Sequence, residues 1–78
     1  KNFWKEAVRT NPESAFSNAY LGNAYMENHQ MNNAILSYNK ALQIKPDLKM
    51  ALLNRAVSEL QINKTQKAVT DLESYLTM

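Results

Sequence analysis

Apolar and small residues recur along this chain at the three- and four-residue spacing of helices that bury one side. In the middle of the chain two such stripes follow each other, formed by Leu21, Gly22 and Tyr25 and then by Ala34, Ile35, Tyr38, Ala41 and Leu42. Helix-breaking residues are rare, with one glycine and two prolines, whereas helix-favouring residues are abundant. The pattern predicts an all-α chain with helices near residues 2–10, 15–28, 32–45, 48–62 and 65–77.

Turn and capping residues punctuate these stripes. Prolines at positions 12 and 46 end the helices that precede them. Ser14 is expected to cap the next helix, and Asp47 to cap the helix one repeat later. The polar run 28–30 separates the two middle stripes, and its central residue, His29, corresponds to Asn63. Asparagine tolerates the left-handed conformation that ends helices, so we expect that conformation here.

The chain repeats itself with a period of 34 residues. The segment 11–13 (Asn-Pro-Glu) matches 45–47 (Lys-Pro-Asp), and Ala34 matches Ala68. One position of the repeat is filled in turn by Trp4, Tyr38 and Leu72. A period in this range is typical of stacked helical repeats, in which neighbouring units bury each other's faces.

The middle copy carries a recognisable signature, which reads Asn18-x-x-Leu21-Gly22-x-x-Tyr25, Ala34-x-x-x-Tyr38-x-x-Ala41 and Pro46. It resembles the tetratricopeptide repeat (TPR), with Asn18 in place of the leading tryptophan. The resemblance implies a right-handed α-solenoid of helix-turn-helix hairpins that forms one domain. Residues 1–10 would be the second helix of a truncated preceding repeat, 15–48 a complete repeat, and 49–78 a second, divergent one.

The resemblance also implies a concave groove, lined by the first helix of each hairpin, that binds protein or peptide. Its candidate residues are Phe16, Ala19, Asn23, Met26 and Glu27 in the middle copy, and Met50, Leu53, Asn54, Val57, Leu60 and Gln61 in the last. The stripe formed by positions 50, 53, 57 and 60 is wholly apolar. If this stripe is exposed, it indicates that the partner is a helix or an apolar peptide. The alternative is that a further helix or a second copy of the chain covers it.

Two asparagines allow a narrower hypothesis. Some family members grip an acidic C-terminal tail with lysine and asparagine side chains, and Asn23 and Asn54 match two of these positions. Ala19 stands where the lysine would be. The alternative is that both asparagines bond the backbone or a neighbouring helix. On the first helix of the second copy, on the side opposite the predicted groove, Arg55 and Glu59 are four residues apart and are expected to pair.

The last copy differs from the earlier ones at positions that bear on where the repeat array ends. Tyr75 takes the place of the small residues Ala7 and Ala41, where a following hairpin would pack closely. Terminal repeats are typically atypical, so residues 65–78 are expected to be the last regular helix of the array. The chain does not begin with methionine and reads as a fragment.

Composition narrows the classes of function. The net charge is +2 with no basic run, which argues against nucleic-acid binding. No apolar stretch reaches the roughly 20 residues that span a bilayer, so direct membrane insertion is not expected. There is no cysteine, which fits a reducing compartment, and His29 alone makes neither a metal site nor a catalytic centre. We therefore expect no cofactor and no enzyme activity. Protein recognition is expected, with an oligomerisation module as the alternative.

Overall fold

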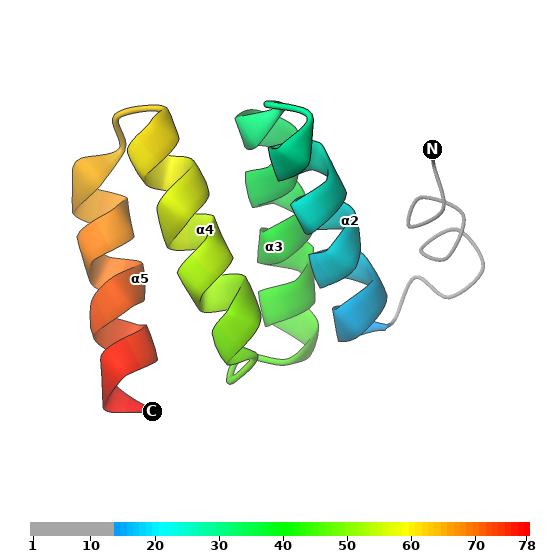
Figure 1. Cartoon of the computed structure of the whole chain (residues 1–78). Coiled ribbons are helices and arrows are strands. Elements are labelled where there is room, and N and C mark those ends of the chain that lie inside the picture. The colour runs from blue at the N-terminus through cyan, green and yellow to red at the C-terminus, as the bar shows by residue number, and fades with distance from the viewer. Residues whose placement is uncertain (1–13) are drawn as a thin grey trace.

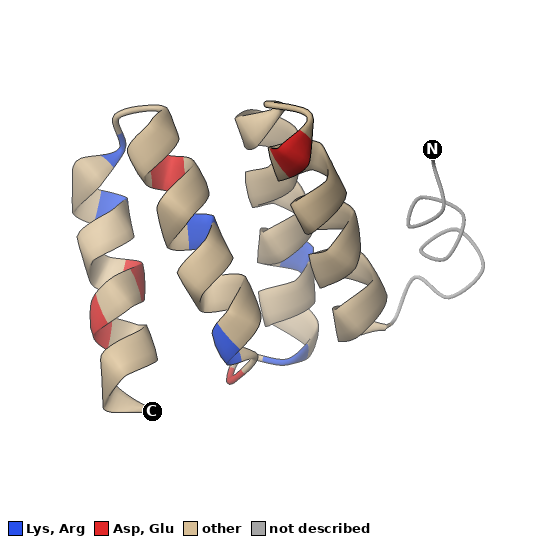
Figure 2. Ribbon diagram, viewed as in Figure 1, with Lys and Arg blue, Asp and Glu red and all other residues tan. Residues whose placement is uncertain are grey.

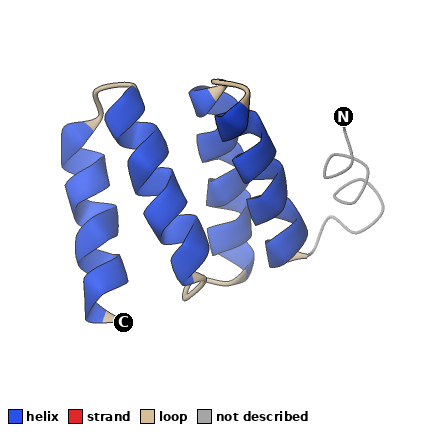
Figure 3. Cartoon of the chain, viewed as in Figure 1, coloured by secondary structure: helices blue, strands red, loops and turns tan. Residues whose placement is uncertain are grey.

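The computed structural model describes residues 14–78, and throughout that range the regular structure is helical (Figure 3). The elements are α2 (Ala15–Glu27), α3 (Met31–Ile44), α4 (Lys49–Gln61) and α5 (Thr65–Thr77). This confirms the all-α prediction, and the four helices begin and end within a residue or so of the predicted positions. The predicted helix near 2–10, and Trp4 within it, lie outside the described residues.

The four helices form two antiparallel hairpins that stand next to each other (Figure 1). Helix α3 packs against both α2 and α4, α4 also packs against α5, and α2 touches α4 across the junction. The described part of the chain is therefore a short stack of helical hairpins, in agreement with the predicted solenoid. The first helices of the two hairpins meet, which places α2 and α4 at one common face.

The two predicted N-caps behave differently. The Ser14 hydroxyl accepts a hydrogen bond from the backbone N–H of Ser17 at 3.1 Å, which satisfies one of the free donors in the first turn of α2. The prediction for Asp47 is wrong, because Leu48 is the N-cap of α4 and makes no side-chain cap. Asp47 lies one residue too early and instead pairs with Lys45 at 3.2 Å in a well-exposed salt bridge.

The two hairpin turns share one geometry. His29 has a φ of 61° and Asn63 a φ of 65°, as expected for the left-handed residue after a helix. In each turn the next N–H reaches back five residues, from Gln30 to the Tyr25 carbonyl and from Lys64 to the Glu59 carbonyl, both at 2.8 Å. These bonds satisfy carbonyls that α2 and α4 would otherwise leave open.

The core is built from alanines around one tyrosine. Six alanines are fully covered, at positions 19, 34, 41, 51, 56 and 68, and Tyr38 is the largest fully buried side chain. The Tyr38 ring lies against Gly22, where a Cβ atom would stand 2.6 Å from the ring's Cε1. In the second copy Ala56 stands in place of Gly22, and Leu72 in place of Tyr38. The residue on the first helix of the hairpin is thus larger where the residue on the second helix is smaller.

We predict that Gly22→Ala lowers the free energy of unfolding by about 1–2 kcal/mol, because overpacking outweighs the better helix propensity of alanine. In a Tyr38→Leu background, which imitates the second copy, the same change should be neutral or stabilising. Urea unfolding followed by circular dichroism measures both effects. An equal loss in the two backgrounds would show that the tyrosine ring is not what excludes a side chain at position 22.

Candidate partner-binding face

The eleven residues predicted for the groove belong to α2 and α4, and we call them the α2–α4 face. Three of its apolar members are open to solvent: Phe16 is 50% exposed, Val57 37% and Leu60 48%. Leu53 is half-buried, and Glu27 and Gln61 are exposed. Helical geometry places Val57 and Leu60 on one side of α4, three residues apart. The face thus offers apolar contacts in two places, near the start of α2 and along α4.

One predicted member is not reachable. Ala19 is 0% exposed and lies in the core cluster with Ala34 and Tyr38. A partner therefore cannot touch its side chain in this conformation. Sequence position placed it on the groove side of α2, but a methyl group is too short to emerge between larger neighbours.

The two asparagines of the face bond to each other. Asn54 Nδ2 donates to Asn23 Oδ1 at 2.9 Å, and the Tyr38 hydroxyl donates a short hydrogen bond to the same oxygen. Burial raises the pKa of Tyr38, so its hydroxyl remains a donor. This network joins α2, α3 and α4. Each asparagine therefore bonds a neighbouring helix, as the alternative interpretation of these residues expected. Each amide also has polar atoms that the Asn23–Asn54 bond does not use.

The methionines of the face lie against the same network. Met50 Sδ is 3.9 Å from Asn23 Nδ2, and Met26 Sδ is 3.2 Å from the Ser58 hydroxyl. Both methionines are partly buried and pack against the core cluster. Their flexible side chains fill the junction between the hairpins and can repack when a neighbour changes.

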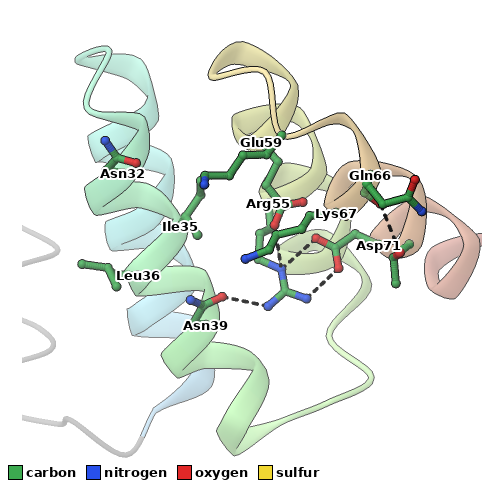
Figure 4. Close-up of a pocket in the computed structure, with 11 residues that line it drawn as sticks. Asn32, Ile35, Leu36, Asn39, Arg55, Glu59, Gln66, Lys67 and Asp71 are labelled. Atoms are coloured by element: carbon green, nitrogen blue, oxygen red, sulfur yellow. Dashed lines mark hydrogen bonds and ion pairs between the residues drawn. The ribbon is translucent and has the colours of Figure 1, made fainter.

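A pocket of about 500 Å³ opens among α3, α4 and α5 on the side of α4 away from Val57 and Leu60 (Figure 4). In it, Arg55 donates two hydrogen bonds to Asp71, at 2.7 and 2.8 Å, and one to Asn39 at 2.8 Å. The predicted pair with Glu59 is longer, at 3.9 Å. The planar guanidinium favours the two-bonded carboxylate, and no local pattern pointed to Asp71, which lies 16 residues away on another helix.

Charge is distributed unevenly over the helices (Figure 2). Helix α2 carries a single charged residue, Glu27, and α3 a single one, Lys40, whereas α4 and α5 each carry both signs. Among the residues predicted for the α2–α4 face, Glu27 is the one with a charge. The side chains of the face therefore provide no positive charge to attract a phosphate or carboxylate group.

Two further searches concern residues 14–78. None of the helices there is long and apolar enough to cross a bilayer. The same residues include no group of three or more His, Cys, Asp or Glu side chains placed to hold a metal ion.

Comparison with known proteins gives two kinds of match. The family model described as tetratricopeptide repeat matches residues 17–48. Over 75 residues the chain is 33% identical to the peroxisomal targeting signal receptor of Saccharomyces cerevisiae and 31% identical to that of Candida glabrata. Each match covers 96% of this chain, but only 12% and 13% of the respective receptor. The chain is thus similar to a small part of each receptor.

The shared acceptor at Asn23 generates a prediction. Tyr38→Phe should lower the free energy of unfolding by about 1 kcal/mol, since it removes one hydrogen bond without a change of shape. In an Asn23→Ala background the same change should cost much less, because the acceptor is gone. Urea unfolding of the wild type, the two single variants and the double variant completes this double-mutant cycle. Tyr75→Phe is the matched control, as the ring of Tyr75 rather than its hydroxyl faces Lys49, at 4.9 Å. Equal costs in both backgrounds would contradict the coupling.

Proposed function

Because this chain belongs to the tetratricopeptide-repeat family, we propose that it binds a helix or an apolar peptide segment on the α2–α4 face. The family and the similarity to two receptors support the broader statement that it is a non-catalytic module for interaction with protein or peptide. The observation that carries the finer proposal is the exposure of Phe16, Val57 and Leu60 on the two helices that the family uses for binding.

The chemistry of the face indicates the kind of segment. Apolar side chains of a partner would cover Val57 and Leu60, which removes apolar surface from water. The amides of Asn23 and Asn54 lie between the hairpins and can exchange hydrogen bonds with a peptide backbone. Partly buried methionines beside them can adapt to the shape of the ligand. An amphipathic helix or an extended apolar strand of peptide uses all three features.

A carboxylate-gripping groove is the weaker alternative. The two relatives are, by name, receptors of a targeting signal, and an address read at a C-terminus ends in a carboxylate. In this chain Ala19 is buried where a gripping lysine would stand, and the charged member of the face is the acidic Glu27. A carboxylate would therefore meet amide donors without a cation from the face itself.

The other alternative is that the face is filled by the chain itself or by a second copy. Sedimentation velocity across a hundredfold range of concentration separates the cases. A monomer throughout the range excludes a second copy as the occupant, and the peptide-binding test below decides between the chain itself and a partner. A concentration-dependent dimer that the double variant Val57→Lys with Leu60→Glu returns to monomer would replace the partner proposal with the oligomerisation reading.

The direct test begins with peptides of 15 residues selected from a random display library on the full chain. We expect Val57→Lys with Leu60→Glu to weaken binding of the selected peptides by at least about tenfold, because two charged side chains would have to lose their water at an apolar contact. Leu36→Glu, at an exposed apolar residue of α3 that lines the pocket, is the matched control and should leave affinity unchanged. Circular dichroism verifies that helix content is kept.

Two outcomes would reject the proposed face. In one, the selected peptides bind the double variant as tightly as the original chain. In the other, Leu36→Glu weakens them as much as the double variant does. For the carboxylate alternative, a peptide ending in Ser-Lys-Leu is compared with its C-terminal amide. Binding that needs the free carboxylate would favour that alternative over an apolar segment.

A further inference from the structure

The carboxyl groups of Glu59 and Asp71 and the guanidinium of Arg55 line the pocket, together with Lys64 and Lys67. Arg55 on α4 donates hydrogen bonds to Asp71 on α5 and to Asn39 on α3, at 2.7 to 2.8 Å. These bonds connect α4 to both neighbouring helices. Glu59, one turn along α4, approaches Arg55 only to 3.9 Å. One arginine therefore neutralises one carboxylate well and leaves the second poorly compensated.

Glu59 is also deprived of water. The residue is 4% exposed, and its Oε1 atom is buried with no donor among the described residues. A buried, ionised carboxylate without donors is costly, and since its Oε1 is closed to solvent, water cannot satisfy that atom either. A proton on the carboxyl removes the charge and turns the group into a donor. Asp71, which lines the same pocket, offers an acceptor, because a carboxyl can bond a carboxylate only when one of the two carries a proton.

We propose that Glu59 is a buried proton-binding site, whose carboxyl is protonated in the folded protein at mildly acidic pH and donates to Asp71. The proton then becomes part of the packing of α5 against α4. When it leaves, two carboxylates that are largely shielded from water compete for Arg55, and the contact between these helices weakens. Val57 and Leu60 lie on the opposite side of α4, so the helix that carries the proposed binding residues is also the helix whose packing against α5 involves this proton.

The surroundings set the direction of the effect. Burial, followed by the hydrogen bond and the charge of Asp71, raises the pKa of Glu59 from 4.5 to about 7, against the opposing influence of Arg55 and Lys67. For Asp71, burial acts upward, but the hydrogen bonds from Arg55 prevail and lower its pKa. From α3 the pocket receives Asn32, Ile35, Leu36 and Asn39, which do not titrate, and Lys64 lines it from the α4–α5 turn.

The consequence for stability follows from linkage. A carboxyl whose pKa is higher in the folded state than in the unfolded state favours folding most below its unfolded value. That contribution is lost as the pH rises from 4.5 to about 7, while the lowered pKa of Asp71 removes stability only at still lower pH. One such proton changes the folding equilibrium constant by at most about tenfold per pH unit.

The first test uses the full chain without any substitution. The side-chain carboxyl carbon of Glu59 is followed by NMR from pH 3 to pH 9. We expect a titration midpoint near the raised value, about 7, whereas the carboxyl of Glu73, which is exposed on α5, serves as the internal reference. A Glu59 midpoint at the ordinary 4.5 would overturn the proposal, whatever the variants do.

The second test measures stability by urea unfolding at pH 5 to 8. The folding equilibrium constant of the wild type should fall across this window by up to about tenfold per pH unit. Glu59→Gln, whose amide donates to Asp71 permanently, should abolish this decline and be more stable than the wild type at pH 8. Glu73→Gln changes the same charge at an exposed site and should decline as the wild type does. A Glu59→Gln variant that declines as steeply as the wild type would contradict a proton at this residue.

Discussion

The burial of one tyrosine ring sets the geometry of the first hairpin and of its junction with the second. Tyr38 is fully enclosed, its ring lies against the bare backbone of Gly22, and its hydroxyl donates to Asn23. Because Asn23 also accepts from Asn54, the ring on α3 fixes the approach of α2 and the register of α4. A ring of this size fits only where its partner has no side chain, and its polar end is tolerated in the interior only because it has an acceptor. Size and hydrogen bonding therefore constrain the same three helices together.

The two sides of α4 are stabilised by different means. Toward α2 the contacts are apolar and amide groups, with Met26 and Met50 filling the space between them. Toward α5 the contact includes buried alanines such as Ala56 and Ala68, and in addition Arg55 and two carboxyl groups that are largely shielded from water. An ionic contact of this kind depends on the protonation of its members, whereas apolar packing does not. A single helix thus carries both the proposed partner-binding residues and the proposed proton-binding site.

The candidate site was only partly accessible to sequence reasoning. The family resemblance predicts that α2 and α4 bind a partner, and the exposure of Phe16, Val57 and Leu60 agrees with that prediction without testing it. Ala19 was grouped with them because it shares their side of the helix, but side-chain length decides whether a residue reaches the surface. The role of Asp71 could not be inferred, because it belongs to no motif and meets Arg55 only after the helices pack.

The sequence by itself determined the helices, the turns and the repeat, because these depend on spacing along the chain and on the local conformational preferences of residues such as His29 and Asn63. It also determined where small residues allow close packing, since the period places Gly22 and the alanines at matching positions. Tertiary structure alone decided that Asn23 bonds Asn54 and that Arg55 bonds Asp71 rather than Glu59, which is closer to it in the sequence. It also decided that Oε1 of Glu59 has no donor among residues 14–78. These contacts join residues 16 and 31 positions apart, or depend on the exclusion of water, and both follow from how the helices pack rather than from the order of residues along any one of them.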